Sequence, residues 1–324
     1  MPADVRRQLA SKLLHDRHVR FNCRQAAGAR RPFSVSRIRI GISGWQYGDW
    51  QGRFYPSELP QKERLRYLAR RFPTVEINGT FYSLKQPQHF RNYYRQTPRD
   101  FRFAVKGGRY ITHMKRLGDV RVPLANHFAS GVLELKEKLG PHLWQLPRDF
   151  RFEANRIEAF LALLPRDSES AARLAAEHDD RLPGAASTRA HGRRRLRHAL
   201  EVRHPSFLCD AFIRLLHDYG VALVFSHSDD RWPYFEDVTA GFVYLRLHGP
   251  GKLYASPYDE RALGDWSDRV RRWHEGGQPA DAKTAGSRKP PRRGSRDVYV
   301  YFDNTDKVHA PKNAQRMAER LGLT

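Results

Sequence analysis

Ionisable side chains recur inside short apolar runs of this sequence. In the run 74–82, Glu76 and Asn78 alternate with Val75 and Ile77. Alternate residues of a strand share a face, so the carboxylate and the amide point one way and the aliphatic side chains the other. A buried carboxylate must be paired or must open onto a solvated site. The run therefore predicts either a structural ion-pair network or part of a catalytic site.

Four further runs repeat this alternation. Their polar faces carry Lys106, Glu201 with Arg203, Arg246 with His248, and Asp303. Most of these residues stand near the end of a predicted strand. We expect five strands to bring their polar groups to one mouth, where an acid and base set can operate.

The residue types suggest separate roles. Glu76 and Glu201 are predicted general acid and base, because a carboxylate in a dry pocket or beside another carboxylate can titrate near neutral pH. His248 completes the predicted catalytic set. The predicted substrate-binding residues are Asn78, Lys106, Arg203, Arg246 and Asp303, with the two arginines suited to bidentate binding of an anion. The loop Gly249–Lys252 that follows His248 is a weaker candidate for phosphate binding.

Aromatic residues cluster at 45–55 and at 81–82. We favour a hydrophobic plug under the first loop, and a stacking surface for a base or sugar ring is the alternative. Trp45 and Tyr82 are kept as candidate substrate-binding residues for that alternative.

No cofactor is predicted, and a divalent metal is kept as an alternative. The side chains with suitable ligand chemistry are Glu76, His113, Glu201, His204, His248 and Asp303. Their spacing is not diagnostic, because the sequence has neither a His-x-x-x-His pair among them nor a Cys pair.

Eight strand candidates alternate with helices and predict an α/β fold, a TIM-type (β/α)₈ barrel in a single domain. The predicted strands are 38–42, 74–81, 101–105, 143–146, 198–202, 221–225, 242–247 and 298–302. The predicted helices are 60–72, 88–96, 126–139, 155–164, 168–177, 209–219, 261–274 and 314–321. The helix after strand six is weak or missing. A doubly wound open sheet is the rival, but no Gly-x-Gly-x-x-Gly follows the first strand.

The net charge of +23 is concentrated in three segments. Residues 1–39, 181–197 and 276–296 carry +8, +6 and +5, which leaves only +4 for the rest of the chain. We expect residues 1–37 to be a disordered basic extension, with an organellar presequence as an alternative. Residues 38–323 are expected to form the barrel, in which 181–197 is a loop and 276–296 an insertion.

Two cysteines, Cys23 and Cys209, and the lack of a long apolar run predict a cytoplasmic protein without a membrane span.

Seven ordered motifs resemble the domain-of-unknown-function 72 family, also called YecE-like. They are Gly41-Ile42-Ser43-Gly44-Trp45 with Tyr47, Trp50, Gly52 and 54–56; 75–82; Phe103 with Lys106 and 111–113; 139–141 with 145–147; 201–206; 244–249; and 300–304. The resemblance covers roughly 38–323 and implies a TIM barrel in a cytoplasmic setting. It supplies no reaction. Ile42 and Gly79 depart from the family, which usually has Thr and Ser there.

The leading functional hypothesis is an enzyme, hydrolase- or isomerase-like, that uses carboxylate acid and base chemistry on a polar or anionic small molecule or a nucleotide-derived group. The alternative is a nucleic-acid-binding protein, including one that cleaves phosphodiesters, which uses the basic segments and the aromatic surface. The oligomeric state is left open.

Overall fold

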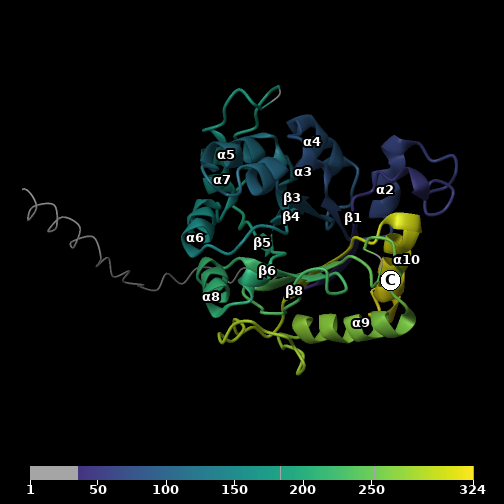
Figure 1. Ribbon diagram of the computed structural model, residues 1–324. Helices are drawn as coiled ribbons and strands as arrows, with labels where there is room; N and C mark the ends of the chain where they lie inside the picture. Colours follow the sequence, from purple (N-terminus) through teal and green to yellow (C-terminus); the bar gives the residue numbers. More distant parts are fainter. Residues whose placement is uncertain (1–35, 183, 252, 324) are drawn as a thin grey trace, which may run out of the picture. The chain divides into compact units, whose positions relative to one another are not determined.

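Eight parallel strands close into a barrel in the order in which they occur along the chain (Figure 1). The computed structural model describes residues 36–182, 184–251 and 253–323. The strands are β1 (Ile38–Ser43), β2 (Thr74–Ile77), β3 (Arg102–Lys106), β4 (Leu139–Gln145), β5 (His198–Glu201), β6 (Ala222–His227), β7 (Phe242–Leu247) and β8 (Asp297–Phe302). β1 and β8 close the barrel through five residue pairs, from Ile38 opposite Val298 to Ile42 opposite Phe302. The predicted (β/α)₈ barrel is confirmed.

Helices surround the barrel on all sides in Figure 1. They are α2 (Arg64–Ala69), α3 (Gly79–Tyr82), α4 (Pro87–Arg95), α5 (Arg121–Ala129), α6 (Ala154–Leu163), α7 (Ser168–Ala175), α8 (Asp210–Tyr219), α9 (Glu260–His274) and α10 (His309–Arg320). Shorter helical turns are η1 (Gly48–Trp50), η2 (Gln61–Glu63), η3 (Tyr110–Met114), η4 (Val132–Lys138), η5 (Pro205–Phe207) and η6 (Asp306–Val308). The connection 228–241 between β6 and β7, described throughout, has no helix, as predicted.

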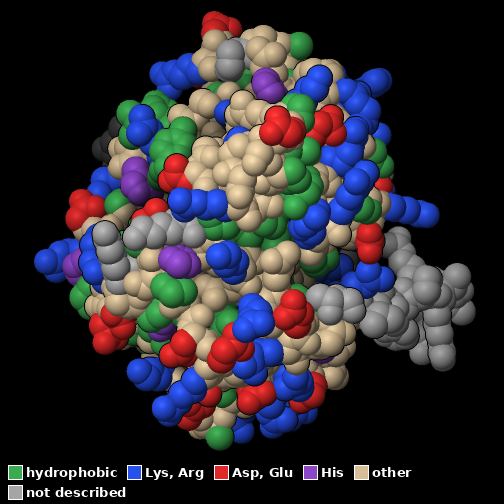
Figure 2. All heavy atoms as spheres, turned by 90° about the vertical axis from the view of Figure 1, so that its right-hand side faces the viewer, with side chains coloured by type: hydrophobic (Ala, Val, Ile, Leu, Met, Phe, Trp, Pro, Cys, Tyr) green, Lys and Arg blue, Asp and Glu red, His purple; other side chains and the backbone are tan. Residues whose placement is uncertain are grey.

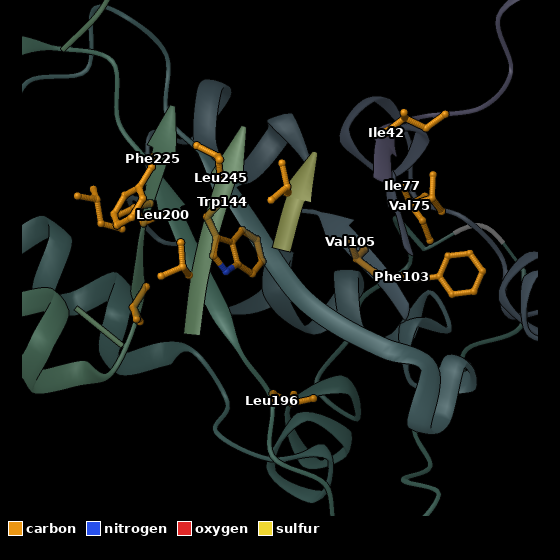
Figure 3. Packing of buried hydrophobic residues seen from close by; sticks show 14 of the residues in the cluster. Ile42, Val75, Ile77, Phe103, Val105, Trp144, Leu196, Leu200, Phe225 and Leu245 are labelled. Carbon is orange, nitrogen blue, oxygen red and sulfur yellow. The ribbon is translucent and has the colours of Figure 1, made fainter. Parts of the chain in front are cut away.

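Two apolar layers follow from the alternation of side chains along the strands. The outer layer, between strands and helices, includes Ile42, Val75, Trp144, Leu200 and Leu245 (Figure 3). The inner layer fills the barrel with small and aromatic side chains, Ala104, Leu143, Ala199, Ala222, Val224, Ala240, Phe242, Tyr244, Tyr299 and Tyr301. The barrel is a packed core below its carboxyl end, so any ligand must bind at the strand ends.

Several predicted boundaries are wrong. The strand predicted over 74–81 ends at Ile77, because Asn78 is already helical and α3 begins at Gly79. The helix predicted over 126–139 is interrupted at Gly131, which has φ +106° and where a Cβ would lie 2.4 Å from the Cα of Pro87. The turn η4 ends at Lys138, and β4 starts at Leu139, four residues before the predicted start.

The basic insertion 276–296 packs against the barrel. Asp237 accepts hydrogen bonds from the backbone amides of Ala285 and Gly286, at 2.9 and 3.0 Å. Arg296, 1% exposed, donates to the carbonyl oxygens of Gly277 and Pro291. The positive charge of Arg296 is therefore buried and hydrogen-bonded inside the fold, and it is not free to bind a partner.

Lys and Arg side chains are spread over the face shown in Figure 2, with Asp and Glu between them. Residues 1–35 of the predicted extension, including Cys23, lie outside the described residues. Cys209 is a free thiol. No helix within the described ranges is long and apolar enough to cross a membrane.

Candidate active site at the carboxyl end of the barrel

Arg246 on β7 holds three carboxylates together at the carboxyl ends of the strands. Its Nε and Nη2 donate to the two oxygens of Glu76 on β2, at 3.1 and 2.9 Å. Its Nη1 donates to Glu201 Oε2 at 2.8 Å, and Nη2 also donates to Asp303 Oδ2 at 2.9 Å. Because Arg246 is 1% exposed, these charge-assisted bonds lie in a dry environment where they are strong.

Glu201, on β5, is paired with a second arginine. Arg203 Nε donates to Glu201 Oε1 at 2.7 Å, and the Arg203 guanidinium stacks 4.0 Å from the ring centre of Trp232. Burial alone would raise the pKa of Glu201, but Arg203 and Arg246 outweigh it and hold the pKa well below its usual range. Glu201 is therefore a fixed anion at neutral pH.

Glu76 accepts hydrogen bonds from two hydroxyl groups, one from the adjacent strand β1 and one from β7 across the barrel. Ser43 on β1 donates to Glu76 Oε1, and Tyr244 on β7 donates to Oε2, both at 2.7 Å. Asn78 Nδ2 in turn donates to Ser43 Oγ at 2.8 Å, while its buried Oδ1 has no hydrogen-bond partner among the described residues. Buried acceptors are normally satisfied, so this oxygen is available to a ligand donor.

His248 supports Arg246. Its Nδ1 lies 3.1 Å from the carbonyl oxygen of His227 and its Nε2 lies 3.0 Å from Arg246 Nη1. Burial and the nearby Arg246 charge hold the pKa of His248 well below its usual value, so the imidazole is neutral. Since the carbonyl can only accept, Nδ1 carries the proton and Nε2 accepts from Arg246.

Lys106, at the end of β3, is the cation of the site that lacks a carboxylate partner. Lys106 is 9% exposed, and its Nζ lies 4.4 Å from the ring centre of Phe81. No carboxylate among the described residues lies within ion-pair distance of it. Burial, with a contribution from Arg246, lowers the pKa of Lys106 to about 8.

Asp303, just after β8, is the most accessible of the three carboxylates. Its side chain is 12% exposed, whereas those of Glu76 and Glu201 are fully buried. Burial and the Glu76 charge raise the pKa of Asp303 despite Arg246. Its tendency to bind a proton is therefore greater than that of an ordinary aspartate.

Eight of the ten predicted site residues come together here. We call the site the mouth, and it consists of these eight residues with Ser43 and Tyr244: Ser43, Glu76, Asn78, Lys106, Glu201, Arg203, Tyr244, Arg246, His248 and Asp303. Trp45 does not join them, because it is 6% exposed and packs edge-to-face on Tyr93, which agrees with the plug interpretation. Tyr82 is 68% exposed on α3 and lies beside the mouth.

The list of candidates drawn from the sequence omitted three contributors. Ser43 and Tyr244 share the interior face of their strands, so the same alternation could have identified them. Trp232 gave no such signal, because it lies in the irregular connection after β6. Its indole Nε1 donates to Ser226 Oγ at 2.9 Å, which fixes the ring that stacks on Arg203.

The alternative metal ligands are differently placed. His204 Nδ1 contacts Ser206, and His113 packs edge-to-face on Phe81. Within the described ranges no three His, Cys, Asp or Glu side chains are arranged to hold a metal ion. Lys252 of the candidate phosphate loop lies outside the described residues.

Comparisons with known proteins agree with this architecture. UPF0759 protein YecE of Escherichia coli is 28% identical over 196 residues, which are 59% of each chain. UPF0759 protein YunF of Bacillus subtilis is 30% identical over 79 residues, 24% of this chain and 27% of YunF. The chain thus spans less than two thirds of the length of either curated relative.

Solved structures share the fold. A DUF72 family protein from Thermotoga maritima superposes with a TM-score of 0.67 at 23% identity, over 88% of this chain and 99% of that chain. Another from Enterococcus faecalis gives a TM-score of 0.62 at 18% identity, over 89% and 96%. A family model described as "Protein of unknown function DUF72" matches residues 39–324, so this chain belongs to the DUF72 family.

Proposed function

We propose that the protein is an enzyme that binds a small anionic substrate at the mouth of the barrel and transfers a proton to or from it. The observation that carries this proposal is Lys106. A buried ammonium group is costly to desolvate, and structural lysines normally recover that cost through carboxylates or several hydrogen bonds. Lys106 has no carboxylate partner in the described part of the chain, so an incoming anion would supply one.

The charges of the mouth balance without the substrate. Arg203, Arg246 and Lys106 stand against Glu76, Glu201 and Asp303, and His248 is neutral. The two arginines already hold Glu76 and Glu201, so these anions serve best to fix Arg246 and the electrostatic field of the site. A substrate anion at Lys106 would add negative charge and favour protonation of Asp303.

Asp303 is therefore the preferred proton donor and acceptor. Its raised pKa and partial exposure suit a group that exchanges protons with a bound molecule. This assignment shifts acid and base chemistry from Glu76, Glu201 and His248, the residues predicted from the sequence, to their neighbour. Asn78 Oδ1 would accept a hydrogen bond from a substrate hydroxyl. Such a set suits hydrolysis or isomerisation of a phosphorylated or carboxylated compound.

The test separates binding from turnover. A panel of sugar phosphates and carboxylates is screened by calorimetry, and the compound that binds is assayed for conversion. Lys106→Met is expected to abolish binding, while Asp303→Asn keeps binding and lowers kcat by about a hundredfold or more. Lys62→Met, an exposed lysine on η2, is the charge-matched control. Unchanged affinity in Lys106→Met would refute the proposal.

Nucleic-acid binding by the basic segments stays a prediction. It would show as affinity that falls steeply with salt.

A further inference from the structure

An apolar pocket of about 290 Å³ lies next to the mouth, between α3 and η3. Its wall is formed in part by Phe81, Tyr82, Tyr110 and Met114, and Arg109 and Arg181 also line it. The volume is at the lower end of the range of small-molecule sites, so it suits one ring system rather than a large ligand.

Exposed apolar side chains gather around this pocket. Within the described ranges, six large hydrophobic residues are exposed, and three of them, Tyr82, Tyr110 and Met114, line it. Tyr82 is 68% exposed and Met114 64% exposed. Large apolar side chains concentrated at one concave place mark a binding surface, whereas scattered ones need no explanation.

The backbone beside the pocket is strained. η3 is a π-helical turn, a rare form that is frequent at functional sites. The residues that follow include Arg116, Leu117 and Asp119 with φ of 48°, 64° and 47°. Three left-handed non-glycine residues within four positions cost stability, and such strain clusters at ligand-binding segments.

Phe81 connects the pocket to the mouth. Its ring lines the pocket and also lies 4.4 Å from the ammonium of Lys106. Thr80, another lining residue, donates from Oγ1 to the carbonyl oxygen of Lys106 at 2.6 Å. Lys106 itself does not line the pocket, but two lining residues contact it, so a molecule with its ring in the pocket would bring an anionic group to the lysine by extending past Phe81.

The chemistry of the wall favours a planar aromatic ring. Tyrosine and phenylalanine rings stack on bases, and a methionine thioether packs well against aromatic edges. Arg181 donates from Nη1 to the Tyr110 hydroxyl at 2.9 Å, so it presents a cation at the pocket's rim. The two arginines disfavour a cationic ring and suit one that carries hydrogen-bond acceptors.

We propose that this pocket binds the base of a nucleoside monophosphate whose phosphate is held by Lys106. This inference rests on the proposed function and names its substrate class. The ring occupies the space between Tyr82, Tyr110 and Met114, and the phosphate supplies the anion that Lys106 lacks.

Three probes test the two halves separately: AMP, adenosine and ribose 5-phosphate, each titrated by calorimetry. Wild-type protein is expected to bind AMP about tenfold or more tighter than ribose 5-phosphate, since stacking of one base is worth about 1–3 kcal/mol. Tyr82→Ala combined with Met114→Ala should bring AMP down to the affinity of ribose 5-phosphate and leave the latter unchanged. Leu208→Ala, an exposed apolar residue outside the pocket lining, should change nothing.

The outcomes distinguish the two proposals. Lys106→Met should weaken AMP and ribose 5-phosphate but not adenosine. If AMP binds no tighter than ribose 5-phosphate, the ring site is wrong while anion binding at the mouth stands. If ribose 5-phosphate does not bind, or binds equally well to Lys106→Met, the phosphate assignment fails and with it the proposed nucleotide.

Discussion

Arg246 binds Glu76 through two parallel hydrogen bonds that connect β7 to β2 inside the barrel, at 3.1 and 2.9 Å. Both side chains are at most 1% exposed. The same guanidinium reaches Glu201 and Asp303, so one residue fixes carboxylates from three other parts of the barrel. The pair therefore stabilises the barrel as well as forming part of the candidate site.

Substituting Glu76 with Gln should destabilise the protein. Removing one partner of a buried pair leaves uncompensated charge, and we expect a loss of about 3–5 kcal/mol in the free energy of unfolding. Urea denaturation measures it. Glu177→Gln removes the surface ion pair with Arg121 and serves as control, with no measurable change expected. Wild-type stability in Glu76→Gln would contradict the buried network.

Lys106→Met and Lys138→Met should differ in their effect on stability. Both lysines are buried, at 9% and 4% exposure. Lys138 Nζ donates to the carbonyl oxygens of Tyr94 and Thr97 at 2.6 and 2.7 Å, so its loss should cost about 1–3 kcal/mol. Lys106 has no such hydrogen bonds to the described residues, so its replacement should leave the free energy of unfolding unchanged or raise it. A large loss in Lys106→Met would point to a structural role.

Anion affinity should fall as the pH rises above about 8. The pKa of Lys106 is lowered to about 8 by burial, so the ammonium is protonated below that pH and neutral above it. With ribose 5-phosphate as probe, whose phosphate is fully ionised by pH 7.5, affinity should decrease about tenfold per pH unit above pH 8. Lys106→Arg should flatten this profile, because arginine stays protonated. A flat wild-type profile would argue against Lys106 as the anion's partner.

Three buried histidines, with His142 stacked on His198 and edge-to-face against His127, should make the fold sensitive to acid. Burial lowers the pKa of His127 to about 3 and of His198 to about 4, and holds that of His142 well below 6.5. The unfolded chain binds these protons near pH 6.5 and the folded chain does not, so stability falls as the pH drops below about 6.5. Each histidine contributes up to about 1.4 kcal/mol per pH unit until its folded pKa is reached.

His142→Phe is the variant that tests this. The ring of His142 lies 5.2 Å from Phe128, and its Nε2 has no partner among the described residues, so phenylalanine should fit. The difference in urea midpoint between pH 7.5 and pH 5.0 should shrink in this variant. The exposed His89→Gln should behave like wild type, and an unchanged difference in His142→Phe would exclude His142 as a cause.

Gly41→Ala should disrupt the barrel between β1 and β2. A Cβ at Gly41 would lie 2.2 Å from the carbonyl oxygen of Thr74, and backbone cannot move aside cheaply. We expect the free energy of unfolding to fall by about 1–3 kcal/mol. Gly48→Ala is the control, because a Cβ there meets nothing within 4 Å. Thermal denaturation of the two variants checks the difference, and equal midpoints would contradict the close approach.

Much of the candidate site could be predicted because side-chain alternation in a strand is a local property. The positions of Glu76, Lys106, Glu201 and Arg246 on the interior face follow from their aliphatic neighbours alone. The boundaries of β2 and β4 were less accessible. β2 ends early because Asn78 already turns into α3, and the helix before β4 is broken by the close approach of Gly131 to Pro87, a contact between segments far apart in the sequence.

The sequence by itself determined the (β/α)₈ barrel, the set of polar side chains at its carboxyl end and the family, since all three depend on residue order and period. Only the tertiary structure decided how those charges are shared. In the described part of the chain Arg246 pairs with three carboxylates and Lys106 with none, because distances across the barrel, and not spacing along the chain, set which ions pair. The tertiary structure also buries Trp45 and leaves Tyr82 exposed beside Phe81, whose ring contacts Lys106, and so distinguishes the plug from the pocket.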